Sequence, residues 1–125
     1  MTDADLIWNR AAIDNGGDSP EVGDRALADL LAAHGLVMNG GVFHAVECLD
    51  DNELAAASNG YRHFGLEAIG TLFNQASETL DTGEEIDERE AEFDAAYLAI
   101  VADDSSLAER FENRLASHPH EFAPI

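Results

Sequence analysis

The stretch Asn39-Gly40-Gly41, which interrupts an apolar segment rich in Ala and Leu, is the feature that most constrains the fold. Asn-Gly between apolar flanks is a strong signal for a β-hairpin, because both residues tolerate a positive φ. The same residues also suit a junction between two helices, at which glycine permits a close approach of the backbone. The flanking residues decide between the two, since hairpin strands need alternating apolar and polar positions.

The residues on both sides of this stretch favour helix. Leu36-Val37-Met38 does not alternate between apolar and polar residues. After the stretch, Phe43, Val46 and Leu49 follow at the three-residue spacing of a helix face. We therefore predict that Asn39-Gly40-Gly41 joins two helices, and we keep the hairpin as the minority alternative.

Helix start and stop signals recur along the rest of the chain. Residues that cap helix N-termini, or a Pro at the first helical position, precede several segments with helical apolar spacing. Gly or Asn, which commonly end helices, follow most of these segments. The predicted starts are Thr2, Ser19-Pro20, Asp50 or Asp51, and Ser106, and the predicted stops are Asn15-Gly16-Gly17, Gly35 and Gly65.

These signals predict one all-α domain over residues 1–125, a compact bundle of six or seven short helices. The length of 125 residues suits a single hydrophobic core, and no segment has a convincing strand pattern. The tail over residues 118–125 contains two prolines and is expected to lie irregularly on the surface.

Composition indicates a cytoplasmic protein. No apolar run approaches the ~20 residues that a membrane-spanning helix needs, and the acidic N-terminus lacks the positive charge of a secretory signal. Cys48 is the only cysteine, so the chain has no intramolecular disulfide, which agrees with a reducing compartment.

The charge is strongly negative, with 26 acids against six arginines, no lysine, and a formal net charge of −20. Proteins that bind nucleic acids or anionic membranes neutralise phosphates with Lys and Arg, so neither is expected as a direct partner. A basic protein is therefore the expected partner for this negative charge. Two alternatives are that the acidity serves solubility, or that it is an adaptation to a saline habitat.

The acids are densest between Glu78 and Asp94, where nine acids accompany only Arg89. Glu84, Glu88 and Glu92 repeat every four residues, so like charges follow one ridge of a helix at a cost of about 0.2–0.5 kcal/mol per pair. A surface that serves only solubility usually mixes both signs, so this run suggests that negative potential itself is needed. We select as partner-binding residues Asp81, Glu84, Glu85, Glu88 and Glu92.

A second hypothesis is a small metal-binding protein or enzyme centred on His44, Glu47 and Cys48. These residues lie at i, i+3 and i+4, and all three types ligate metals. Further ligands have to come from another element, where His34 and His63 are the nearest histidines in mid-chain. Because the set is incomplete, we expect no metal site and no cofactor.

Other catalytic patterns are lacking in the sequence. There is no Gly-x-Ser-x-Gly elbow, and a phosphate-binding loop of the Gly-x-x-x-x-Gly-Lys type is impossible without lysine. Tyr61-Arg62-His63-Phe64 suits a pocket wall or an anion contact, but we favour the interpretation that Tyr61 and Phe64 enter the core while Arg62 meets a carboxylate. We expect the protein not to be an enzyme.

Three stretches together resemble the bacterial DNA-mimic protein family, which consists of small acidic all-helical proteins. They are Asn39-Gly40-Gly41-Val42-Phe43-His44, Leu54-Ala55-Ala56-Ala57 and Gly60-Tyr61-Arg62-His63-Phe64-Gly65, and the resemblance covers about residues 24–115. It implies a cytoplasmic protein, often a homodimer, without cofactor or catalytic residues. It also implies that carboxylates stand in for DNA phosphates and occupy a DNA-binding protein such as a transcription factor. The resemblance transfers no individual binding residue to this chain.

Overall fold

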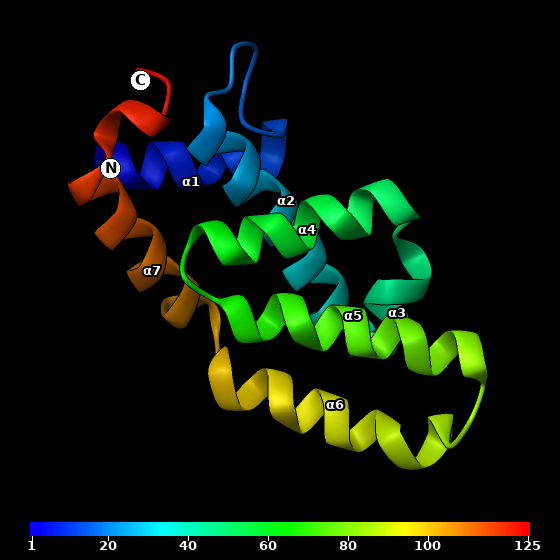
Figure 1. Cartoon of the computed structure of the whole chain (residues 1–125). Helices are drawn as coiled ribbons and strands as arrows, with labels where there is room; N and C mark the ends of the chain where they lie inside the picture. Colours follow the sequence, from blue (N-terminus) through cyan, green and yellow to red (C-terminus); the bar gives the residue numbers. More distant parts are fainter.

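The chain folds entirely into helices and their connections (Figure 1). The computed structural model describes all residues from 1 to 125. No helix is both long and apolar enough to span a bilayer. The prediction of an all-α bundle is confirmed, with seven α-helices and one short 3-10 helix: α1 (Asp3–Asp14), α2 (Val22–Gly40), α3 (Val42–Cys48), α4 (Asp51–His63), α5 (Glu67–Thr82), α6 (Ile86–Ile100), α7 (Asp104–Ser117) and η1 (Pro119–Glu121).

Two helices begin at reciprocal caps that the sequence predicts. The Thr2 hydroxyl accepts the Asp5 N–H at 3.1 Å, and the Asp5 carboxylate accepts the Thr2 N–H at 3.1 Å. Asp50 and Glu53 form the same arrangement at the start of α4. Such caps satisfy backbone donors that have no partner within the helix. The predicted stop at Asn15 is also confirmed, since this residue ends α1 in the left-handed conformation.

Three predicted helix boundaries are wrong, and side-chain caps explain two of them. Helix α2 begins at Val22 and not at Pro20, because the Asp24 carboxylate accepts the N–H of Glu21 at 2.9 Å. It continues past Gly35 to Gly40. Helix α7 begins before Ser106, because the Asp103 carboxylate accepts the Ser106 N–H at 3.2 Å.

The tail is more ordered than the predicted irregular segment over 118–125. It contains η1, and the buried Phe122 ring lies 5.4 Å from that of Phe111 between centroids. The Ala123 N–H donates to the buried Asp24 carboxylate at 2.7 Å, and Arg10 also donates to Asp24, at 2.9 Å. The C-terminus is therefore held by apolar and polar contacts to helices α1, α2 and α7.

Asn39-Gly40-Gly41 joins two helices, as predicted. Helix α2 ends at Gly40 and α3 begins at Val42. Gly41 between them has a φ of 94°, a conformation that glycine adopts without strain. A Cβ atom at Gly41 would also lie only 2.9 Å from a carboxylate oxygen of Asp94.

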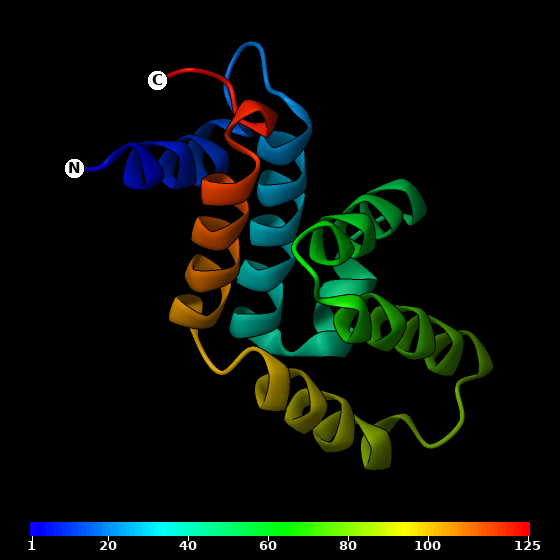
Figure 2. The same cartoon turned by 60° about the vertical axis from the view of Figure 1, so that its left-hand side comes forward.

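Helix α2 is the centre of the arrangement. Helices α1, α3 and α4 pack against it, α5 packs on α3 and α4, and α6 packs on α3 and α5. Gly60 lets α4 approach α2 closely, since a Cβ there would lie 2.6 Å from the carbonyl oxygen of Ala26. The turn between α5 and α6 lies at the opposite end of the molecule from both chain termini (Figures 1 and 2).

Candidate functional site

The five predicted partner-binding acids all lie around the α5–α6 turn. Asp81 is in the last turn of α5, Glu84 and Glu85 are in the connection, and Glu88 and Glu92 lie in the first two turns of α6. All five side chains are exposed. The structure therefore brings these residues to one end of the molecule, which we call the acidic end.

No positive side chain neutralises the acidic end. None of its five carboxylates takes part in an ion pair. Arg89, the one base in this segment, lies with its Cζ atom 4.9 Å from the centre of the Phe93 ring. Its Nη1 donates to the hydroxyl of Thr79 on α5 at 3.1 Å. Arg89 thus makes a cation–π contact within α6 and a hydrogen bond to α5, and the neighbouring carboxylates keep their charge unpaired.

Asp94, the last acid of the same run, has a structural role. Its carboxylate accepts the N–H of Val42, the first residue of α3, at 2.9 Å. A carboxylate at a helix N-terminus satisfies a free donor and is favoured by the helix dipole. A cap supplied by a distant helix leaves no local signal in the sequence, so sequence reasoning missed this contact.

The second hypothesis, a site at His44, Glu47 and Cys48, gains no additional ligand. The Cys48 sulfur lies 3.7 Å from ring nitrogens of His44 within α3, and Glu47 is exposed. His34 and His63 bond to other residues, Asp104 and Glu121. No group of three or more His, Cys, Asp or Glu side chains lies close enough to share an ion.

A chain of buried hydrogen bonds links four helices. The hydroxyls of Tyr61 on α4 and Tyr97 on α6 lie 2.6 Å apart. The Tyr97 hydroxyl lies 2.7 Å from Nδ1 of His34 on α2, and His34 Nε2 lies 2.7 Å from a carboxylate oxygen of Asp104 on α7.

One direction of these hydrogen bonds satisfies all four side chains. Asp104 accepts from Nε2–H of His34, His34 Nδ1 accepts from the Tyr97 hydroxyl, and the Tyr97 oxygen accepts from the Tyr61 hydroxyl. Burial raises the pKa of both phenols, so both keep their protons.

The buried hydrogen-bond chain has no access to a ligand. Tyr61 and Tyr97 are 0% exposed and His34 is 5% exposed. Only Asp104, whose side chain is 81% exposed, reaches solvent. We interpret the chain as a structural element that fixes the relative positions of α2, α4, α6 and α7.

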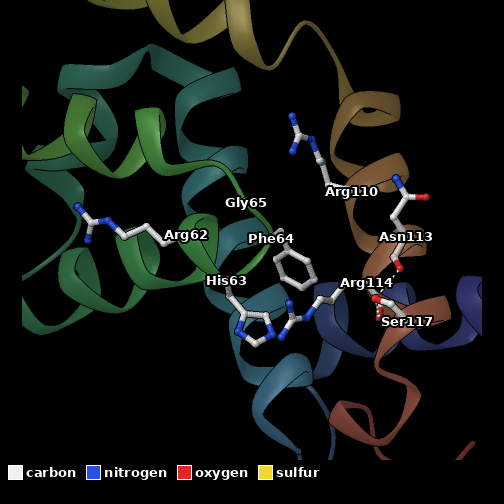
Figure 3. Close-up of a pocket in the computed structure, with 8 residues that line it drawn as sticks. All are labelled: Arg62, His63, Phe64, Gly65, Arg110, Asn113, Arg114 and Ser117. Carbon is white, nitrogen blue, oxygen red and sulfur yellow. Dashed lines mark hydrogen bonds between the residues drawn. The ribbon is translucent and has the colours of Figure 1, made fainter.

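A second surface feature is a hollow of about 370 Å³ between the end of α4 and α7, lined mainly by polar and cationic side chains (Figure 3). Helix α4 and the loop after it contribute one wall, and α7 contributes the other. Three of the six arginines of the chain line it. The lining residues are Arg62, His63, Phe64, Gly65, Arg110, Asn113, Arg114 and Ser117.

The cations of this basic hollow already hold one carboxylate of the chain. Arg114 donates through Nε and Nη2 to the two oxygens of Glu121, both at 2.7 Å. His63 Nε2 lies 3.0 Å from one of these oxygens. The hydrogen bonds from Arg114 lower the pKa of Glu121 to about 2, and His63 adds to the effect.

The interpretation that Tyr61 and Phe64 enter the core while Arg62 meets a carboxylate is confirmed. Tyr61 and Phe64 are buried, and Arg62 Nε lies 3.4 Å from the Glu67 carboxylate. His63, for which no contact was predicted, faces Glu121. The stretch therefore also forms one wall of the basic hollow, whereas the α7 residues that complete it give no motif in the sequence.

Comparison of the chain with protein-family models, with curated proteins and with solved structures found no match. The resemblance to the DNA-mimic family therefore stays a prediction.

Proposed function

We propose that the protein is a non-enzymatic interaction protein whose acidic end binds a basic partner, most simply a DNA-binding protein such as a transcription factor. In this proposal Asp81, Glu84, Glu85, Glu88 and Glu92 take the place of DNA phosphates. The observation that carries the proposal is the position of Arg89. The only base among these acids is folded against Phe93 and Thr79, so the five exposed carboxylates have no partner within the chain.

The spacing of the carboxylates supports DNA mimicry. Glu88 and Glu92 are one helical turn apart, which corresponds to a rise of about 6 Å along α6. Phosphates on one DNA strand rise about 3.4 Å per nucleotide, so the rise between these two carboxylates is close to the axial rise over two nucleotides. The net charge of −20 also equals the charge of about one turn of duplex DNA.

The triple variant Glu84→Gln, Glu88→Gln and Glu92→Gln tests the proposal. A partner is first captured from cell extract with the wild-type chain, and its affinity is then measured by calorimetry at several salt concentrations. We expect wild-type binding to weaken steeply as salt rises, because salt screens charges on exposed surfaces. We also expect the triple variant to bind at least about tenfold more weakly at low salt.

A control variant with the same change in charge separates a local site from overall acidity. Asp3, Asp18 and Glu112 are exposed, take part in no ion pair and lie outside the acidic end. Changing these three to Asn, Asn and Gln should reduce affinity far less than the triple variant does. Equal losses from both variants would mean that only net charge matters, as expected for acidity adapted to salt.

A further inference from the structure

We propose that the basic hollow between α4 and α7 binds a phosphate group, either free phosphate or the phosphate of a small monoester. This site is independent of the acidic end and of the function proposed for it. Its residues come from the last turn of α4, the loop before α5, and the C-terminal half of α7 (Figure 3).

Arg110 is the residue on which the proposal depends. It is exposed, it has no carboxylate within ion-pair distance, and it makes no side-chain hydrogen bond. Its guanidinium lies beside Gly65, where an added Cβ would be 3.3 Å from Nη1. Arginine presents five donors in a planar fork that suits phosphate oxygens. In a chain with a net charge of −20, an unpaired arginine that opens on a hollow is well placed to bind an anion.

The surrounding residues complete a set of donors. Arg114 uses Nε and Nη2 for Glu121, which leaves its Nη1 group without a partner in the chain. The side-chain amide of Asn113, one turn of α7 from Arg110, is also free and lines the same hollow. Arg62 contributes less, because its side chain points away from the other residues of the hollow (Figure 3). Its guanidinium lies against Gly70 and pairs with Glu67.

Two further observations agree with an anion site. Two residues that line the hollow, Arg114 and His63, already bind a carboxylate, that of Glu121, and their hydrogen bonds lower its pKa. The acidic end lies at the far end of α5, a helix of 16 residues and therefore about 24 Å long. This separation exceeds the Debye length of about 10 Å at 0.1 M salt, so the acidic end repels a bound anion only weakly.

The hollow has room for a small molecule. Its volume of about 370 Å³ is at the lower end of the range for small-molecule sites. Both helices present their C-terminal ends here, and the partial negative charge of those ends opposes an anion. The attraction must therefore come from the arginine side chains, so removal of Arg110 alone should abolish most of the binding.

The test is a titration of the full chain with inorganic phosphate at constant ionic strength, followed by NMR of backbone amides and arginine side chains. We expect saturable shifts at Gly65, Asn113 and the Arg110 Nε–H. Arg110→Gln should weaken binding about tenfold or more, because it removes charge-assisted hydrogen bonds. Asn113→Ala should weaken it less, by a few-fold, and provides a second variant within the same hollow.

Arg25→Gln is the matched control. Arg25 is also an exposed arginine without an ion pair, but it lies on α2 outside the hollow. This variant should bind phosphate as tightly as the wild-type chain. Equal losses in Arg110→Gln and Arg25→Gln, or no saturation up to about 20 mM phosphate, would overturn the proposal.

A parallel titration with glycerol 3-phosphate distinguishes the two sources of the phosphate group. Tighter binding of the ester than of inorganic phosphate assigns the hollow to a monoester, since its carbon chain then contacts the protein as well. Equal binding assigns it to the phosphate group alone. If neither compound shifts the signals of the hollow, the site does not exist.

Discussion

The buried hydrogen-bond chain makes a specific prediction about the two tyrosines. The Tyr97 hydroxyl has two partners, His34 Nδ1 and the Tyr61 hydroxyl, whereas the Tyr61 hydroxyl has only Tyr97. Tyr97→Phe therefore leaves two buried groups without a partner, the Nδ1 of His34 and the hydroxyl of Tyr61. Each such group costs about 1–3 kcal/mol, so we expect a loss of about 2–6 kcal/mol in the free energy of unfolding.

Tyr61→Phe has an effect whose sign depends on the background. In the wild-type chain it removes one hydrogen bond to Tyr97 and should destabilise the fold by about 1 kcal/mol. In the Tyr97→Phe background it removes a buried hydroxyl that already lacks a hydrogen-bond partner, so it should stabilise the fold by about 1–2 kcal/mol. The double variant should then be more stable than Tyr97→Phe alone.

Urea unfolding of the wild-type chain, both single variants and the double variant measures this cycle. The comparison is valid where the slope of free energy against urea is the same for all four proteins. If Tyr61→Phe destabilises both backgrounds by the same amount, the two hydroxyls are not coupled. The hydrogen bond between Tyr61 and Tyr97 would then contribute nothing to stability, and the structural role of the buried chain would be wrong.

Two further predictions concern carboxylates that the fold itself uses. Asp94→Ala removes the cap of α3 and should lower the free energy of unfolding, measured in urea, by about 1 kcal/mol. Glu90→Ala, on the exposed side of α6, is the control and should change this free energy little. Glu121 has a pKa of about 2 in the fold against an ordinary value of 4.5, so its ion pair stabilises the fold above about pH 4.5 and loses this effect as the pH falls toward 2. The stability difference between the wild-type chain and Glu121→Gln should therefore shrink over that range, and a difference independent of pH would contradict the assignment.

Much of the helical fold could be predicted because its signals are local. Thr2 with Asp5, Asp50 with Glu53, and Asn15 are caps or stops that lie within four residues of the boundary they determine. The helix junction at Asn39-Gly40-Gly41 followed from the apolar spacing around it. In these helices, the spacing of the apolar residues and the capping residues predict the same helix boundaries.

The order of the tail and the cap of α3 could not be predicted, because residues distant in sequence make the contacts. Asp24 binds both Ala123 and Arg10, so the order of the tail depends on contacts across the chain. The cap of α3 comes from Asp94, more than fifty residues away. Such contacts have no periodic signature.

The two candidate sites also differ in how much of each could be predicted from the sequence. The acids around the α5–α6 turn are close in sequence, so their clustering could be predicted. The position of Arg89 could not, because it depends on its contacts with Phe93 and with Thr79 of α5. The basic hollow combines residues from α4 and α7 that are about fifty positions apart. Of this hollow, the sequence pointed only to the wall formed by Arg62-His63-Phe64, as a candidate pocket wall or anion contact.

Competition with DNA tests the central proposal most directly. The partner captured by the wild-type chain is titrated with a duplex that carries its own DNA site, in the presence of increasing amounts of this protein. If carboxylates of the acidic end occupy the DNA-binding surface, the apparent affinity of the partner for DNA should fall in proportion to the amount of this protein added. We expect the triple variant, Glu84→Gln with Glu88→Gln and Glu92→Gln, to compete at least about tenfold less well. A ternary complex, in which the partner holds DNA and this protein together with undiminished affinity, would contradict DNA mimicry.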